Sequence, residues 1–394
     1  MLAQGKIPPR WEVVRAGDVI DVRDGTHDSP KPVGIGIPIV TSKNLVGGRI
    51  DFDSCSFISE ADHKKISQRS AVDDGDILYA MIGTIGNPVL VEKTREFSIK
   101  NVALFKFSGH RVYNRFFLHF LQSDNVKRQF QKKARGGTQK FVSLGNIRGL
   151  EVPLPSLPEQ RRIAAILDKA DELRQKRRQA IEKLDQLLQS VFLDMFGDPV
   201  TNPKGWPMVP LGDLGTLDRG KSKHRPRNAP ELLGGEHPLI QTGDVANSEG
   251  YIRSYKSTYS DLGLAQSKKW PKGTLCITIA ANIASTGILD FDACFPDSVV
   301  GFTPNKSSNS EFIQGLFRFL KQILEEKAPQ VAQKNINLKI LRELPVLLPD
   351  INTQNKYREA VVRSVKQKTA LERSGNKQEQ LFKSIQQRAF NGTL

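Results

Sequence analysis

Residues 157–197 read LPEQRRIAAILDKADELRQKRRQAIEKLDQLLQSVFLDMFG, and this stretch decides the fold. Pro158 stands where a helix can begin, because the N–H that proline lacks would be unpaired in the first turn. The residues that follow are good helix formers, and neither Gly nor Pro occurs again before Gly197. The stretch therefore predicts one helix, which at 1.5 Å per residue would be roughly 60 Å long. A rod of this length suits a spacer or a dimerisation arm better than a catalytic element.

The apolar residues of this helix recur with a heptad spacing. If Ile163 occupies position a and Ile166 position d, only Arg177 interrupts the apolar series. A sustained seam of this kind requires a partner helix. The seam predicted from the spacing is Ile163, Ile166, Ala170, Leu173, Arg177, Ala180, Leu184, Leu187 and Val191.

The partner is predicted within the same chain, because the stretch recurs in weaker form at a constant offset of 194 residues. The chain therefore reads as two copies of one unit, a globular part followed by a long helix. The identities pair Gln139, Lys140, Leu144, Arg148, Leu150, Val152, Leu154, Pro155, Gln160, Leu187, Ser190 and Phe196 with Gln333, Lys334, Leu338, Arg342, Leu344, Val346, Leu348, Pro349, Gln354, Leu381, Ser384 and Phe390.

Each globular part mixes strands with a helix. Trp11, Gly17-Asp18 and Gly25 match Trp206, Gly212-Asp213 and Gly220 at an offset of 195, and we interpret them as shared scaffold. The loops between the expected elements align poorly, which favours two domains of one fold that recognise different ligands. Expected strands are 37–41, 77–82, 102–107, 238–242, 275–280 and 298–302, and expected helices are 113–134 and 311–327.

The composition points to a polyanionic partner. Of 394 residues, 58 are Lys or Arg and 42 are Asp or Glu, which gives a formal net charge of +16. The charge is shared between residues 1–200, at about +7, and residues 201–394, at about +9. A basic protein of this kind prefers nucleic acid among polyanions; a merely soluble basic protein is the alternative. The three cysteines form no CxxC pair, and no long apolar run occurs, so we expect a cytoplasmic protein without a zinc site, disulfides or a membrane span.

Two clusters of cations are candidate DNA contacts. The first surrounds a glycine turn at 136–138, where the backbone could approach a phosphate closely; a solvated helix end is the alternative. The second lies in a loop rich in Pro and Gly, where no helical spacing pairs the charges. The candidate DNA-binding residues are Lys127, Arg128, Lys132, Lys133, Arg135, Lys140, Arg219, Lys221, Lys223, Arg225, Arg227 and Lys334, the last at the position equivalent to Lys140.

Sequence motifs that suggest catalysis are weak. Residues 215–222 fit the phosphate-loop pattern GxxxxGK[ST], but prolines on both sides disfavour the strand and helix that such a loop needs. Pro296-Asp297 and Glu325–Lys327 fit the PD…ExK pattern of nucleases, but the other half of the chain has no equivalent. Clustered His or Cys residues and an amino-methyltransferase stretch of the NPPY type do not occur. We expect no catalytic residue, no metal site and no bound cofactor in this chain.

The whole chain resembles the specificity subunit of type I restriction–modification enzymes. The resemblance is carried by the Pro-Glu-Gln start of the long helix at 154–163, by 195–206 and by 388–392, which read LPSLPEQRRI, MFGDPVTNPKGW and RAFNG. It implies an α+β fold: two similar mixed α/β target-recognition domains, separated by two long antiparallel coiled-coil helices in an internal pseudo-twofold repeat. The implied boundaries are 1–150 and 201–345 for the domains, and 151–200 and 346–394 for the helices.

The resemblance also implies partners and cofactors. Each domain would recognise half of a split sequence in double-stranded DNA, and two methylation subunits would dock on the helices. Those subunits use S-adenosylmethionine, and a restriction subunit that uses ATP and Mg²⁺ can join; none of these cofactors is expected in this chain. One departure concerns the second helix, where Gln354 lacks the Pro-Glu before it and Gly375 lies in a polar middle, 366–380. Because Gly costs roughly 1 kcal/mol against Ala inside a helix, the sequence leaves open whether this helix is continuous.

We therefore interpret the chain as a non-catalytic DNA sequence-recognition subunit. One alternative is a helical scaffold whose globular ends bind protein. A further alternative is an enzyme that uses the loop around Gly220-Lys221-Ser222 to bind a nucleotide.

Overall fold

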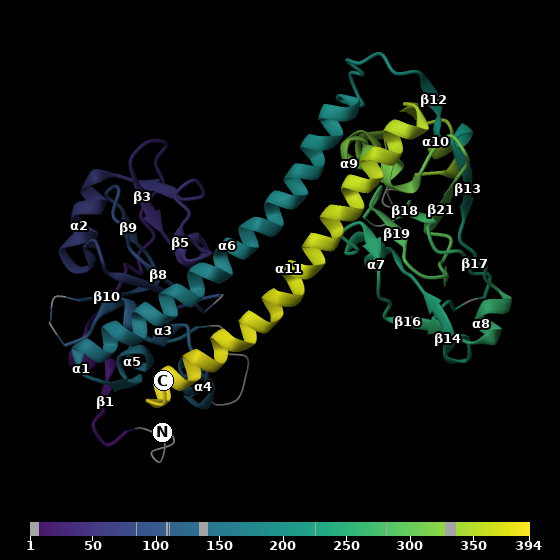
Figure 1. Ribbon diagram of the computed structural model, residues 1–394. Coiled ribbons are helices and arrows are strands. Elements are labelled where there is room, and N and C mark those ends of the chain that lie inside the picture. Colours follow the sequence, from purple (N-terminus) through teal and green to yellow (C-terminus); the bar gives the residue numbers. More distant parts are fainter. Residues whose placement is uncertain are drawn as a thin grey trace. The chain divides into compact units, whose positions relative to one another are not determined.

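The computed structural model describes residues 8–83, 85–107, 109, 111–133, 141–224, 226–280, 282–327 and 336–394. The chain forms two compact units, the first from 1–178 together with 373–394, and the second from 179–372. Two long helices, α6 (Leu157–Phe196) and α11 (Ile351–Asn391), each contribute residues to both units (Figure 1). The predicted long helix is confirmed, and so is its partner.

The first unit is built from short, mostly antiparallel sheets and helices, and β3 and β9 form its parallel pair of named strands. A four-stranded sheet has the order β2-β10-β7-β8, a three-stranded sheet the order β6-β3-β9, and β1 pairs with β11. The strands are β1 (Glu12–Arg15), β2 (Asp21–Asp24), β3 (Ile37–Val40), β4 (Leu45–Val46), β5 (Arg49–Ile50), β6 (Ser56–Ile58), β7 (Ile77–Ala80), β8 (Gly86–Leu90), β9 (Ser98–Ile99), β10 (Val102–Lys106) and β11 (Glu151–Leu154). The helices are α1 (Ala16–Val19), η1 (Ser42–Asn44), α2 (Glu60–Ser70), α3 (Asn114–Leu121), α4 (Asp124–Lys133) and α5 (Leu144–Arg148).

The second unit repeats this strand order and adds one strand to each sheet, β15 to the first and β17 to the second. Its sheets have the orders β13-β21-β18-β19-β15 and β16-β14-β20-β17, and β12 pairs with β22. The strands are β12 (Met208–Pro210), β13 (Gly215–Arg219), β14 (Leu233–Leu239), β15 (Tyr251–Ile252), β16 (Ser257–Tyr259), β17 (Lys269–Trp270), β18 (Leu275–Thr278), β19 (Thr286–Leu289), β20 (Ala293–Cys294), β21 (Val299–Pro304) and β22 (Pro345–Leu347). The helices are η2 (Leu211–Asp213), η3 (Pro230–Leu232), α7 (Thr242–Ala246), α8 (Asp261–Ala265), α9 (Ser310–Lys327) and α10 (Leu338–Arg342).

Two of the predicted elements are wrong in position or extent. The strand expected at 238–242 is β14, which ends at Leu239, because a capping box between Gln241 and Asp244 turns the chain into α7. The helix expected at 113–134 is divided into α3 and α4. At the division the hydroxyl of Ser123 donates to the carbonyl of Phe120 at 2.6 Å and so competes with the helical hydrogen bonds.

Each unit's core is completed by the ends of both long helices. In the first unit, Ile163 and Leu167 of α6 pack in the same core as Phe382 and Phe390 of α11. In the second unit, the core contains Leu188, Phe192 and Phe196 of α6 together with Tyr357 and Val361 of α11. The start of one helix and the end of the other therefore belong to the same core.

The burial pattern of the two helices follows the sequence repeat. Buried positions of α6 and α11 coincide at the offset of 194, and the pairs are Gln160 and Gln354, Ile163 and Tyr357, Leu167 and Val361, Leu188 and Phe382, Phe192 and Gln386, and Phe196 and Phe390. The predicted seam is wrong in detail, because Leu173 is 47% exposed and Leu187 53% exposed. The buried stripe near the end of α6 has a spacing of four residues, since it packs on a domain core rather than only on a partner helix.

Between these ends the helices are joined by polar contacts. In the first unit, Arg174 binds Glu379 at 2.8 Å, and Arg177 donates to the hydroxyl of Ser374 at 2.8 Å. In the second unit, Lys368 binds Asp185 at 3.0 Å. As the residue number rises along α6 it falls along α11, so the helices pair in antiparallel fashion in each unit. Helix α11 is continuous through Gly375, which resolves the question that the sequence left open.

A buried glutamine fixes the start of each long helix to its own domain. The side-chain oxygen of Gln160 accepts from the N–H of Tyr113 at 2.8 Å, and its amide nitrogen donates to the carbonyls of Arg111 and Pro155 at 2.9 Å. Gln354 repeats the pattern with the N–H of Asn309 and the carbonyls of Ser307 and Pro349. The last residue of the Pro-Glu-Gln motif is therefore a structural clamp in both copies.

Replacing this clamp should destabilise the first unit. Gln160→Ala leaves the partly buried N–H of Tyr113 and two carbonyls without their partner, and each unsatisfied group costs up to about 1–3 kcal/mol when it is buried. We expect the free energy of unfolding of this unit to fall by at least about 2 kcal/mol in urea denaturation. Gln175→Ala is the control, because Gln175 is exposed on the same helix and lies in the same unit. Equal losses for the two variants would contradict the clamp.

Gly375→Ala should stabilise the chain, since α11 is helical there and Ala is about 1 kcal/mol more favourable than Gly in a helix. An added Cβ would meet only Arg177 Cδ, at an ordinary 3.6 Å. Gly315→Ala in α9 is the opposing control, because its Cβ would lie 2.8 Å from the ring of Phe192. In urea denaturation the first variant should gain up to about 1 kcal/mol and the second should lose stability. No gain for Gly375→Ala would mean that the helix is not regular at this position in solution.

Candidate nucleic-acid interface

The loop that joins the two sheets occupies the same place in both units. It covers residues 25–36 between β2 and β3, and residues 220–232 between β13 and β14. Each loop begins at a glycine whose N–H donates to the neighbouring strand at 2.9 Å, Gly25 to Val102 and Gly220 to Val299. A Cβ would lie 2.3 Å from a backbone oxygen at Gly25 and 2.2 Å from one at Gly220. Only glycine fits, so both loops leave the frame in the same way.

The second unit presents part of its predicted cation cluster on this loop and at the end of the strand before it. Arg219, the last residue of β13, and Lys221 and Lys223 of the loop are exposed. The loop backbone is held by the residues that follow α8: Gln266 accepts from the N–H of Lys223 at 2.6 Å, and Ser267 donates to the carbonyl of Lys221 at 2.8 Å. Exposed cationic side chains on a backbone that is held by hydrogen bonds are suited to binding phosphates.

Arg227 differs from these cations because it binds Asp297 at 2.6 Å. Its charge is therefore partly neutralised, and Asp297 is engaged in an ion pair rather than in a nuclease constellation. The side chains of Glu325–Lys327 lie outside the described residues, as does Arg225.

The phosphate-loop pattern at 215–222 has the wrong structure. Gly215–Arg219 is strand β13, paired in antiparallel fashion with β21. In the part of the chain that the structure describes, the next helical element is the single turn η3 at Pro230–Leu232. The N-terminus of a longer helix, which a nucleotide phosphate would need, does not follow the loop.

In the first unit, two of the predicted cations line a polar groove. Lys127 and Arg128 of α4 are exposed and border a groove of about 610 Å³ together with the end of α11, which contributes Lys383. Lys127 also binds Asp124 at 3.1 Å. The sequence analysis did not select Lys383 as a candidate, although this lysine lies in the second predicted long helix. The side chains of Lys132 and Lys133, and all of Arg135, Lys140 and Lys334, lie outside the described residues.

The loop 25–36 of the first unit was also missed, although Gly25 had been matched to Gly220. The loop borders a groove of about 380 Å³ that is closed on the other side by α2. At its base, Asp24 is buried and binds both Arg69 and His27. Hydrogen bonds from the ring to Asn101 and Asp24 raise the pKa of His27 and so favour its charged form.

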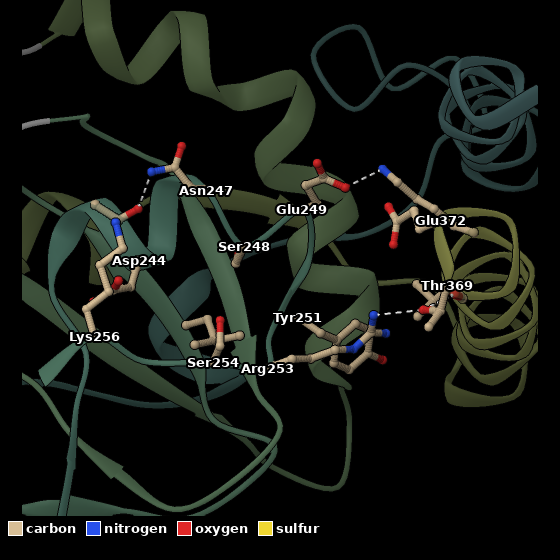
Figure 2. A pocket seen from close by; sticks show the side chains of 14 residues that line it. Asp244, Asn247, Ser248, Glu249, Tyr251, Arg253, Ser254, Lys256, Thr369 and Glu372 are labelled. Carbon is tan, nitrogen blue, oxygen red and sulfur yellow. Dashed lines mark hydrogen bonds and ion pairs between the residues drawn. The ribbon is translucent and has the colours of Figure 1, made fainter. Parts of the chain in front are cut away.

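A third groove, in the second unit, has mixed charge. It lies between α11 and the segment from α7 to β15, with a volume of about 350 Å³. Figure 2 shows Glu249 and Arg253 directed toward α11, where Arg253 donates to Thr369 at 2.9 Å. Lys368 binds Glu249 at 2.7 Å; burial alone would lower the pKa of this lysine, but the bonds to Glu249 and Asp185 outweigh burial and raise it. These contacts fix the domain to the helix, and their balanced charge does not favour nucleic acid.

Within the described ranges, no group of three or more His, Cys, Asp or Glu residues could hold a metal ion. All three cysteines are buried and unpaired, and burial raises the pKa of the Cys55 thiol to about 11. Such thiols are poor nucleophiles at neutral pH. No described helix combines the length and the apolar character that crossing a membrane requires.

Solved structures share this fold. The type I restriction–modification S subunit of M. genitalium is 14% identical, with 99% of this chain and 98% of that chain covered and a TM-score of 0.60. A chain from a study of complex assembly and conformational transition of the type I R-M system is 20% identical, with 99% and 100% covered and a TM-score of 0.60.

Relatives by sequence have consistent names. The chain is 23% identical over 370 residues to a protein of Methanocaldococcus jannaschii provisionally named the type I restriction enzyme MjaX specificity subunit, with 89% of this chain and 85% of that protein covered. It is 24% identical over 199 residues to the EcoBI specificity subunit of Escherichia coli, with 49% and 39% covered. The family model for the type I restriction modification DNA specificity domain matches twice, at residues 8–183 and 203–381. The chain therefore belongs to the type I restriction–modification DNA specificity family and is the sequence-recognising, non-catalytic subunit of such an enzyme.

Proposed function

We propose that this subunit recognises a bipartite duplex target, with one half-site for each globular domain. The observation that carries the proposal is the pair of equivalent loops, 25–36 and 220–232, which begin at corresponding glycines of similar frames and differ in sequence. Because the frame is kept while the loop changes, the two domains suit two different sequences on one DNA. Side chains from loops reach base edges in the major groove, where all four base pairs are distinguishable.

The phosphate contacts are proposed to come from the cations predicted in both halves. Arg219, Lys221 and Lys223 support this assignment best, because all three are exposed, Arg219 at the end of β13 and the two lysines on a loop whose backbone is held by hydrogen bonds. Arg227 supports it less, since it is paired with Asp297. The full proposed set is Lys127, Arg128, Lys132, Lys133, Arg135, Lys140, Arg219, Lys221, Lys223, Arg225, Arg227 and Lys334.

Two methylation subunits are the proposed protein partners, docked on the long helices. Equivalent positions of the two helices carry an exposed leucine, Leu187 on α6 and Leu381 on α11, the latter 57% exposed. The same apolar residue left exposed at the same place in both copies suits two copies of one partner. S-adenosylmethionine is assigned to these partners, and ATP and Mg²⁺ to a restriction subunit that joins them. Such a complex would act in the cytoplasm, where it meets DNA.

Exchanging the sheet region of the first unit should change one half of the methylated sequence. The exchange replaces residues 21–106 with the matching segment of a relative and keeps Val22, Tyr79 and Phe105, which pack in the core that the helix ends complete. Methylome sequencing of cells with the methylation subunits should show one new half-site and one unchanged half-site. The control exchange of residues 215–304 should change the other half. A change in both halves from either exchange would contradict separate recognition.

Removing loop cations should weaken binding to every duplex alike. For Arg219, Lys221 and Lys223 changed together to Ala, the slope of log K against log salt should decrease by up to about three units, since each phosphate contact contributes roughly 0.9. Fluorescence anisotropy with the full chain and an unrelated duplex measures the slope. The control removes equal charge from exposed positions of α6, Lys169, Lys176 and Lys183, and should change the slope less. If the unaltered chain shows no salt-dependent binding to the duplex, the protein-binding scaffold is favoured instead.

A further inference from the structure

The tip of the loop 25–36 is anchored to the residues beside it, although it lies at the surface. The N–H of Val33 donates to the carbonyl of Phe57 at 3.0 Å, which attaches the loop to the edge of β6. A Cβ on Gly36 would lie 2.2 Å from the carbonyl of Ile58, so this residue also lies against β6. On the other side, Lys100 donates to the hydroxyl of Ser29 at 2.5 Å. The loop is therefore anchored before and after its tip.

This anchored tip displays one apolar side chain. Ile35 is 95% exposed, the largest value among the exposed large apolar residues of the described chain. Gly34 and Gly36 flank it, so no neighbouring side chain covers it, and the backbone on both sides could approach another surface closely. An unshielded apolar side chain on an anchored loop is suited to contact with an apolar group of a partner.

Cationic side chains outnumber carboxylates around the base of the loop. Lys31 is exposed on the loop, Lys100 binds Ser29, and Lys65 and Arg69 line the groove at the base together with Asp28 and Asp62. Within the base, the buried carboxylate of Asp24 binds both Arg69 and His27. This arrangement favours an anionic partner, and a duplex combines an anionic backbone with a single apolar feature in its major groove, the C5-methyl group of thymine.

We propose that the loop 25–36 enters the major groove of one half-site and that Ile35 contacts the methyl group of a thymine there. This inference rests on the proposed bipartite recognition of DNA and assigns a specificity-determining residue within it. Lys31 contacts the adjoining phosphates. In the second unit the equivalent loop carries Lys221 and Lys223, so the two domains offer different chemistry at the same place in the frame.

The first experiment defines the target and the role of Ile35. The full chain, assembled with its methylation subunits, selects duplexes from a randomised pool, and the enriched sequences are read for wild type, Ile35→Ala and Val13→Ala. Val13 is an exposed apolar residue on β1 and serves as the matched control. Wild type and the control should enrich the same two half-sites, one with a defined T·A pair that Ile35→Ala no longer selects. The other half-site should be unchanged in all three.

The second experiment isolates the methyl group. Each thymine of the affected half-site is replaced by uracil, which removes only the C5-methyl. One replacement should weaken wild type roughly four-fold, the value expected for one buried methyl, and should leave Ile35→Ala unaffected. The salt slope should be equal for both proteins.

The outcomes separate the inference from the function on which it rests. If wild type enriches two half-sites and Ile35→Ala enriches them equally, or if no uracil replacement weakens wild type, the inference is overturned while bipartite recognition stands. If Ile35→Ala instead prevents assembly with the methylation subunits, the tip is a protein contact and the inference is also overturned. If wild type enriches no sequence, the proposed function and the inference fail together.

Discussion

The structure depends on the burial of helix ends in the cores of the globular parts. In the first unit the ring of Phe390 lies 5.4 Å from that of Phe116 and 5.5 Å from that of Phe120. In the second unit the ring centroids of Phe196 and Phe312 lie 4.8 Å apart. Replacing such a phenylalanine by alanine costs about 3–5 kcal/mol, a large part of the stability of a domain. Since these residues stand 194 apart in the sequence, one packing solution has been used twice.

This construction separates the residues that hold the frame from those that contact partners. The frame consists of the helix ends, the buried glutamines and one arginine in each unit. Arg148 donates to the carbonyl of Val22 in β2 at 2.8 Å, and Arg342 donates to the carbonyl of Leu217 in β13 at 2.7 Å. Most side chains of the loops between the two sheets lie outside the cores, although Ala229 and Leu232 of the second loop are buried in a small cluster with Tyr259. The exposed positions of these loops can therefore change at little cost in stability, while the glycines and the buried positions are kept for the frame.

The repeat, the long helices and the mixed α/β domains could be predicted from the sequence, because they depend on local propensity and on identities at a fixed offset. The buried face of α6 could not be predicted from a heptad, since Leu187 and Leu188 are equally apolar and only the position of the domain core decides which is buried. The ion pair of Arg227 could not be predicted either, because its partner Asp297 is distant in the sequence. Charge density in the sequence selected the loop of the second unit as a candidate but not its counterpart at 25–36, whose features are an anchored backbone and one exposed isoleucine.

The division of the chain has a consequence for its synthesis. The second unit, 179–372, is continuous in sequence, whereas the first unit combines residues up to 178 with residues 373–394. A ribosome releases the first globular part early, but that part cannot complete its core until Phe382 and Phe390 have been made. The domain that is synthesised first is thus the one that finishes folding last, and its exposed apolar surface must persist while the second unit forms. A chain interrupted before α11 ends would carry at most one complete domain.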